Sequence, residues 1–201
     1  MELELSDTIK NKDEDIIIAV DSSGVKVTNR GEWMREKWRI HRGWIKAHIA
    51  VNVNTKEIVA IEVTDEQTSD GDKFEDLIEV SEETIGYDKI KRALGDGAYD
   101  TKGSFGFLHK KGMESGIKTR KDASTKAKGS PYRAKCVRER KKLGYDEWKK
   151  KYDYGMRWAV EGTYSSVKRI FGESVRASSN SGMFKEVIMK FTFYNMLLNW
   201  A

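Results

Sequence analysis

Short apolar runs separated by polar stretches predict a chain in which strands and helices alternate. Ile16–Val20 is mostly β-branched, which favours a buried strand. Polar and apolar positions alternate along Trp44–Asn54, as expected for a strand in a sheet. Three further strands are predicted, at Glu57–Val63, Ile90–Leu94 and Ser115–Lys118.

Helical spacing of apolar residues appears between and after these strands. Four helices are predicted, at Ser69–Glu83, Thr101–Lys111, Tyr154–Phe171 and Phe184–Trp200. Residues 121–151 hold the single proline and are predicted to be a surface insertion, helical from Ser130 to Leu143. Three strands followed by alternating helices and strands indicate an α/β fold, with a mixed five-stranded sheet flanked by helices. We expect one domain over residues 16–201, preceded by a polar N-terminal tail, residues 1–15.

Charge is distributed unevenly along the 201 residues, although the net charge is only +5. Between Lys110 and Lys151 there are 16 Lys or Arg and 5 Asp or Glu. Between Glu57 and Asp88 there are 12 acidic residues and a single Lys. This asymmetry indicates either a face for a polyanion or an ordinary solvated basic surface.

Cysteine content and hydropathy exclude several classes of protein. The single cysteine, Cys136, cannot form an internal disulfide, which fits a reducing, intracellular setting. No histidine stands near it in a recognisable motif, so we assign it no catalytic role. No window approaches the ~18 apolar residues that a membrane span needs. The N-terminus has no signal-peptide pattern.

Three carboxylates are the candidate catalytic residues. Asp21 and Asp96 each end an apolar run, and small residues follow both. Ends of strands are where open α/β sheets place ligands, although acidic residues are also ordinary in turns. Glu161 lies in a predicted helix, with Arg157 and Lys168 on the same side. That pattern is also typical of a salt-bridged surface helix.

The chemistry of these side chains favours phosphoryl transfer. Three carboxylates without a His or Cys site predict hard-cation binding, with Mg²⁺ or Mn²⁺ bound by Asp21, Asp96 and Glu161. Two such ions activate an attacking oxygen and stabilise the leaving one. Arg157 and Lys168 are expected to bind phosphate, because Arg offers a planar fork of donors and Lys a point charge.

The signature Tyr-x2-Arg-x3-Glu-x6-Lys is matched at every position by Tyr154, Arg157, Glu161 and Lys168. Blocks 19–24, 46–51 and 95–100 are also similar to those of the same family. The chain therefore resembles, over residues 16–200, the catalytic domain of an insertion-sequence DDE transposase of the branch with this signature.

This resemblance implies an RNase H-like fold and Mg²⁺-dependent cleavage and transfer of DNA strands at element ends. Asp21, Asp96 and Glu161 would be the metal-binding triad, and Tyr154, Arg157 and Lys168 would contact DNA near the cleaved phosphate. The implied partner is double-stranded DNA, at the element ends and the target, with a homodimer on paired ends. The implied location is the prokaryotic cytoplasm, at the nucleoid.

Several further residues have more ordinary predicted roles. Asp100, with Thr101, is expected to cap the helix that follows. Asp70 and Asp72 are expected to cap the helix near residue 70, with a role near the metal site as the alternative. His48 is expected in the core or at its rim. The remaining aromatic candidates are the tryptophans: Trp44 and Trp158 are predicted to be core residues, whereas Trp33 and Trp38 could stack on unpaired bases.

Two other functions remain open on the sequence. Only about 15 residues precede the first predicted strand, too few for a helix-turn-helix. That favours a chain truncated at its N-terminus, or one that binds DNA through Lys110–Lys151 alone. A DNA-binding remnant without transposition activity is the second function. An RNase H-like nuclease acting on other nucleic acids is the third alternative.

Overall fold

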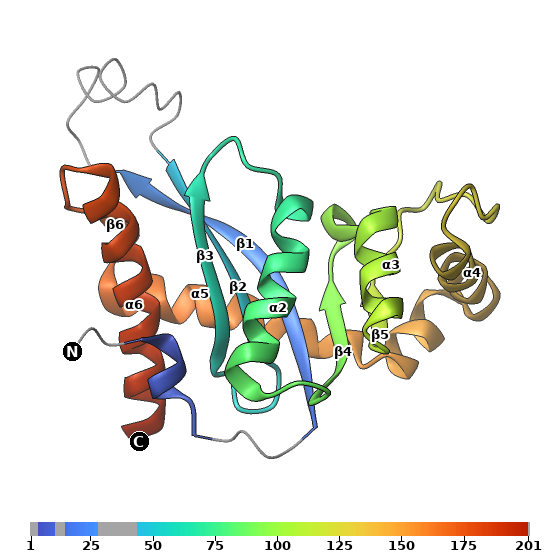
Figure 1. Cartoon of the computed structure of the whole chain (residues 1–201), viewed down its shortest axis with the longest axis horizontal. Helices are drawn as coiled ribbons and strands as arrows, with labels where there is room; N and C mark the ends of the chain where they lie inside the picture. Colours follow the sequence, from blue (N-terminus) through green and yellow to red (C-terminus); the bar gives the residue numbers. More distant parts are fainter. Residues whose placement is uncertain (1–3, 11–14, 28–43, 201) are drawn as a thin grey trace.

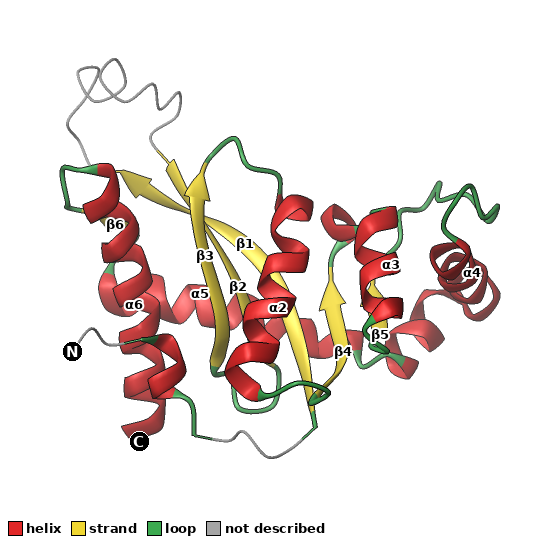
Figure 2. Cartoon of the chain, in the orientation of Figure 1, coloured by secondary structure: helices red, strands yellow, loops and turns green. Residues whose placement is uncertain are grey.

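The fold is a mixed sheet with helices on both faces, seen here in a computed structural model that describes residues 4–10, 15–27 and 44–200 (Figures 1 and 2). The strands are β1 (Ile16–Val27), β2 (Trp44–Asn52), β3 (Ile58–Asp65), β4 (Ile90–Gly95), β5 (Glu114–Ile117) and the short β6 (Ser174–Val175). Their order is β3-β2-β1-β4-β5, and β6 pairs with β1. β1, β2 and β3 form an antiparallel meander, whereas β4 and β5 run parallel to β1.

The helices connect and cover these strands. They are α2 (Phe74–Ile85), α3 (Lys102–Lys110), α4 (Pro131–Lys151), α5 (Trp158–Phe171) and α6 (Asn180–Trp200). Short 3-10 turns are η1 (Leu5–Thr8), η2 (Asp70–Lys73), η3 (Gly97–Tyr99) and η4 (Tyr154–Arg157). The predicted α/β class, with its RNase H-like mixed sheet and flanking helices, is confirmed.

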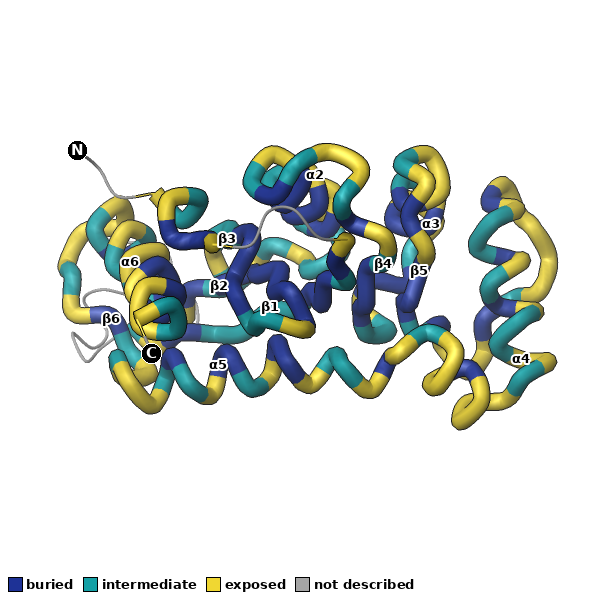
Figure 3. Tube along the Cα trace, turned by 90° about the horizontal axis from the view of Figure 1, so that it is seen from below, coloured by how far each residue is buried: buried dark blue, intermediate teal, exposed yellow. Residues whose placement is uncertain are grey.

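Two cores lie on opposite faces of the sheet, under different pairs of helices (Figure 3). One packs α5 and α6 against β1 and β2, with Ala19, Val160 and Phe191 buried among its members. The other packs α2 and α3, with Ile18 and Phe74. The first half of β1 reads as a continuous apolar run because both of its faces are buried.

Element boundaries differ from the predictions where tertiary contacts extend or divide an element. The strand predicted to end at Val20 continues to Val27, because β2 pairs with it as far as Lys26. The single helix predicted over 154–171 is divided into η4 and α5. The last helix begins at Asn180, before its predicted start.

Part of the predicted polar tail is packed against the C-terminal helix. Thr8 and Ile9 are buried. The Asn195 amide donates to the Thr8 hydroxyl over 3.1 Å, and Asn199 donates to the Thr8 carbonyl over 2.7 Å. Residues 4–10 are therefore a structured part of the fold, and the side chains that stabilise them come from the other end of the sequence.

The basic segment before α5 contains a longer helix than the sequence predicted. α4 runs from Pro131 to Lys151, with non-helical backbone at Gly144 (φ 78°, ψ 173°) where the chain kinks. Positive φ strains residues that carry a Cβ, which explains glycine at this bend. Beyond the kink, Trp148 is buried against Tyr154, with ring centroids 5.0 Å apart. This contact anchors the far end of α4 to the turn that leads into α5.

Candidate active site

Asp21 and Asp96 occupy equivalent positions on neighbouring parallel strands. The last paired residues of β1 and β4 are Ala19 and Leu94. Asp21 lies two residues after Ala19, and Asp96 lies two residues after Leu94. Side chains two residues apart in a strand point to the same face, so both aspartates face the side of the sheet that Ala19 and Leu94 face. The expectation that Asp21 ends its strand is wrong, because β2 continues to pair with β1 after β4 has left it. Asp21 nevertheless lies at the carboxyl end of β4, where Asp96 follows directly.

The loop after β4 fixes the Asp96 side chain. Asp96 is the residue before η3, and its Oδ1 accepts a hydrogen bond of 2.7 Å from the amide of Ala98. The carboxylate is partly exposed. One of its oxygens is thus used by the backbone, and the rest of the group remains available to a ligand.

Glu161 and Asp21 are joined through one arginine. Arg157 Nη1 donates to Asp21 Oδ2 over 3.1 Å, while its Nη2 donates to Glu161 Oε1. Arg157 is largely buried, whereas 55% of the Glu161 side chain is exposed. The i,i+4 salt bridge expected of a surface helix is therefore present, but it also connects α5 to the central strand.

Burial and charge oppose each other at Asp21. Burial raises the pKa of this carboxyl, and the charge of Asp96 adds to the increase. A 2.9 Å hydrogen bond from the Ser22 amide and the charge of Arg157 lower the pKa, without reversing the shift. A second cation near Asp21 and Asp96 would relieve this repulsion.

The chemistry of these donors fits a hard divalent cation, since all three are carboxylates. Among the described residues, however, no three His, Cys, Asp or Glu side chains stand close enough together to hold a metal ion. The structure brings Asp21, Asp96 and Glu161 to one end of β4 without forming a closed ligand set. Arg157 lies between two of them.

Lys168 of the signature and the nearby Tyr164 hold α5 against the same stretch of β1. The Lys168 ammonium donates to the Ser23 hydroxyl over 2.8 Å. The buried Tyr164 hydroxyl lies 2.9 Å from the Asp21 carbonyl oxygen and 2.8 Å from that of Ala47. Tyr154 lies in η4, buried beside Trp148, rather than on α5. Helical spacing thus places Glu161, Tyr164 and Lys168 on the side of α5 that meets β1, with Arg157 directly before the helix.

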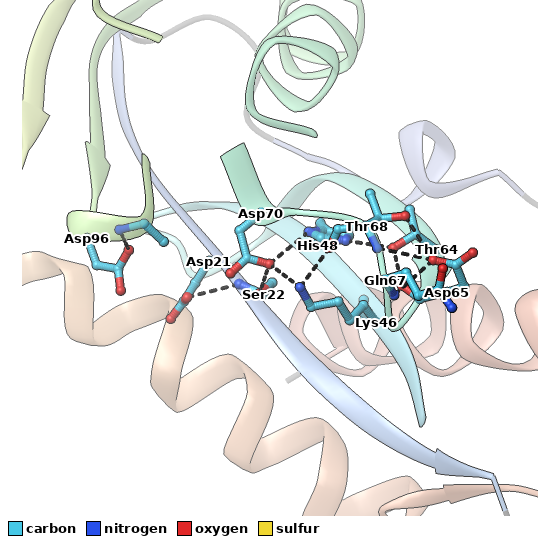
Figure 4. A network of polar contacts seen from close by, with 12 residues as sticks. Asp21, Ser22, Lys46, His48, Thr64, Asp65, Gln67, Thr68, Asp70 and Asp96 are labelled. Atoms are coloured by element: carbon cyan, nitrogen blue, oxygen red, sulfur yellow. Dashed lines mark hydrogen bonds and ion pairs between the residues drawn. The ribbon is translucent and has the colours of Figure 1, made fainter. Parts of the chain in front are cut away.

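A fourth carboxylate, Asp70, extends this polar site (Figure 4). Its Oδ1 accepts from the Ser22 hydroxyl and from the Lys46 ammonium, each over 2.7 Å. The buried His48 ring stands nearby, with Nδ1 3.8 Å from the same oxygen. The capping role predicted for Asp70 is wrong, because its carboxylate binds Ser22 and Lys46, whereas the residue before the turn is Ser69. No local spacing indicated this contact, since Ser22 and Asp70 are far apart in the sequence.

Two more predicted roles need correction or completion. Thr101 alone caps α3, accepting from the Ser104 amide over 3.0 Å. Asp100 is buried and binds Arg133 of α4 through both carboxylate oxygens, at 2.7 and 2.9 Å. Asp72 is exposed, and no side-chain cap is formed at η2. Asp100 is therefore a tether between the loop after β4 and the basic segment.

The aromatic candidates divide differently from the prediction. Trp44 and Trp158 were expected in the core, but they are 37% and 56% exposed. Trp44 is the first residue of β2 and lies over Gly24, where an added Cβ would come within 2.8 Å of its ring. Trp158 is the first residue of α5 and lies under the Lys56 ammonium. Trp33 and Trp38 lie outside the described residues. His48 is a core residue, as expected.

Residues 12–196 match the family described as Transposase DDE domain. The chain belongs to this family. The match spans every strand and nearly all of the helical structure, including the three candidate carboxylates. Membership of this family supports a transposase function in general, with DNA as the substrate that the family implies. None of the described helices is long and apolar enough to cross a bilayer.

Proposed function

We propose that this transposase domain cleaves DNA strands at the ends of an insertion element and joins them to a target. Asp21, Asp96 and Glu161 are the proposed metal-binding residues, with Mg²⁺ or Mn²⁺ as the ions. Bound there, a pair of ions would activate the attacking oxygen and stabilise the leaving one. The main support for this proposal is the register of β1 and β4, which makes Asp21 and Asp96 neighbours. Arg157, one turn before Glu161, contacts Asp21 from the helix side.

The cationic residues of α5 and η4 have a proposed role in holding DNA. Arg157 and Lys168 border the carboxylates from the helix side, and their donors match phosphate oxygens. Tyr154 lies one turn before Arg157, in the same 3-10 turn, and completes the signature of the proposed branch. In this proposal, Arg157 exchanges its carboxylate partners for a DNA phosphate when the acids take up metal.

The proposal extends to the partners of the reaction. The substrate is double-stranded DNA at element ends and at the target, inside the prokaryotic cytoplasm. A homodimer would hold two element ends together, which makes both strand transfers concerted. The DNA specificity of such an assembly is not encoded by phosphate contacts alone.

The test is nicking of a supercoiled plasmid in Mg²⁺ by the whole chain and by Asp96→Asn. We expect activity to fall at least about a hundredfold, because losing a metal ligand removes several kcal/mol of transition-state stabilisation. Asp72→Asn, which alters an exposed acid near the site, is the matched control and should retain activity. Metal binding is measured separately, by calorimetry with Mn²⁺ alone. Equal activity of Asp96→Asn and the unaltered chain would refute the proposed roles.

DNA binding and cleavage of an RNA–DNA hybrid, measured alongside plasmid nicking, separate the alternative functions. An inactive chain that binds DNA tightly would support a remnant, whereas faster cleavage of an RNA–DNA hybrid than of duplex DNA would support an RNase H-like nuclease.

A further inference from the structure

A basic pocket lies between α3 and the start of α4, outside the candidate active site. Its volume is about 500 Å³. Lys102 and His109 line it from α3, and Ser130, Lys135 and Arg138 line it from α4 and the residue before it. No acidic side chain is among the described residues that line this pocket. The pocket is therefore suited to an anion.

The start of α4 contributes backbone donors to the pocket. α4 begins at Pro131 and continues without interruption to the kink at Gly144. The first amides of a helix have no acceptor within it, and the helix dipole makes this end positive. Pro131 has no amide hydrogen, so the free donors belong to the next two residues, Tyr132 and Arg133. A helix start of this kind binds phosphate well.

Ser130 provides an independent sign of a ligand. It is 7% exposed and lines the pocket, immediately before the helix. Its side chain does not cap α4, and its hydroxyl has no hydrogen-bond partner within the described part of the chain. The Ser130 oxygen is not among the fully buried polar atoms that lack a partner in the described residues, so it can be reached from the pocket. A ligand oxygen in the pocket would supply the partner that the protein does not.

Three cations line the same pocket as this hydroxyl. The Lys102 ammonium lies close to Gly129, the residue before Ser130. It is 4.0 Å from where a Cβ at Gly129 would stand. Lys102 and Lys135 both line the pocket, and the charge of Lys135 also lowers the pKa of Glu139, one turn further along α4. Arg138 is held by one bond, from Nη1 to the Thr125 carbonyl, and keeps its other donors free. Several donors lining one pocket match the multiple oxygens of a phosphate.

The pocket is within reach of a duplex bound at the active site. The Asp100–Arg133 pair holds the starts of α3 and α4 together at the carboxyl end of β4. Lys102 is six residues from Asp96, so their Cα atoms are at most about 20 Å apart. That distance corresponds to about six base pairs of B-DNA, at a rise of ~3.4 Å each.

We propose that this pocket binds a backbone phosphate of the DNA duplex, a few base pairs from the bond that is cleaved. Such a contact fixes the register of the duplex without reading its sequence. The identity of the DNA rests on the proposed function, whereas the anion site rests only on the pocket.

The first test uses inorganic phosphate and the whole chain in EDTA, followed by amide NMR. We expect phosphate to shift the amide signals of Ser130, Tyr132 and Arg133, and to shift them less in Ser130→Ala. Duplex DNA should displace the phosphate. Unshifted signals would overturn the site, and phosphate that DNA cannot displace would overturn DNA as its occupant.

The second test measures duplex binding in EDTA over a range of salt concentrations. In Lys102→Ala/Lys135→Ala, the slope of log K against log salt should fall by about 1, the value for one lost phosphate contact. The charge-matched control is Lys10→Ala/Lys91→Ala, two exposed lysines before β1 and at the start of β4. Equal slopes for the two double variants would refute the proposal. Binding in EDTA is independent of the nicking assay in Mg²⁺, so the two proposals fail separately. If the unaltered chain nicks DNA but the double variant keeps its slope, only this pocket is refuted. If the slope falls as expected but the unaltered chain never nicks DNA, only the proposed function is refuted.

Discussion

Removing the Asp100 carboxylate should detach the basic segment from the sheet. Both oxygens of Asp100 are engaged: Arg133 donates to each, and the Arg120 amide donates to Oδ2 over 2.8 Å. The Asp100 side chain is fully buried and that of Arg133 is 18% exposed. In Asp100→Ala, the guanidinium and the amide therefore lose their acceptors in a site with little access to water.

The expected loss of stability follows from this burial. Breaking a buried ion pair by removing one partner costs about 3–5 kcal/mol, because the remaining charge is uncompensated. Arg133 is not fully buried and regains some hydration, which favours the lower end, about 3 kcal/mol. For a domain of this size, that corresponds to a fall in Tm of roughly 6–12 °C.

The assay is urea unfolding followed by far-UV circular dichroism and by tryptophan fluorescence. Trp148 is buried near the far end of α4 and reports its detachment. Asp122→Ala removes the same charge from an exposed position in the loop before α4, and it should leave the midpoint nearly unchanged. The reasoning is wrong if Asp100→Ala unfolds within about 0.5 kcal/mol of the unaltered chain, the range typical of surface substitutions.

Two further predictions concern buried polar groups. Burial lowers the pKa of His48 to about 4, so its imidazole NMR signals should remain those of the neutral ring down to about pH 5. Because the unfolded chain takes up this proton near pH 6.5, His48 should lower stability by up to about 3 kcal/mol as pH falls from 6.5 to 4, and a ring that titrates near 6.5 in the folded protein would contradict this. Asn195→Ala should cost about 3 kcal/mol in urea unfolding, because the buried amide accepts from the Ile58 amide and donates to its carbonyl, and both groups would be left unpaired. A loss under about 1 kcal/mol would show that water replaces the Asn195 side chain.

Local spacing predicted the arrangement within α5. Arg157 and Glu161 are four residues apart, and the ion pair between them forms as helix geometry requires. On the same helix, Val160 and Val167 are buried, seven residues and therefore two turns apart. Such contacts were predictable because a helix fixes the relative positions of residues within a few turns.

Strand ends were less predictable than strand positions. The apolar run stopped at Val20, but β1 continued to Val27 because its hydrogen-bond partners lie on β2. Exposure of Trp158 was missed for a similar reason, since hydrophobicity does not show which helix surface remains uncovered.

The sequence by itself determined the candidates for the chemistry: Asp21, Asp96, Glu161 and the cations beside the last of them. It also determined the α/β class, through the order and periodicity of its apolar runs. Tertiary structure alone decided that Asp21 and Asp96 are neighbours, because this depends on β1 and β4 pairing in one register. It alone joined Asp100 to Arg133 and created the pocket between α3 and α4. Contacts between residues far apart in the sequence follow from the order of strands and the packing of helices, and local patterns do not encode these directly.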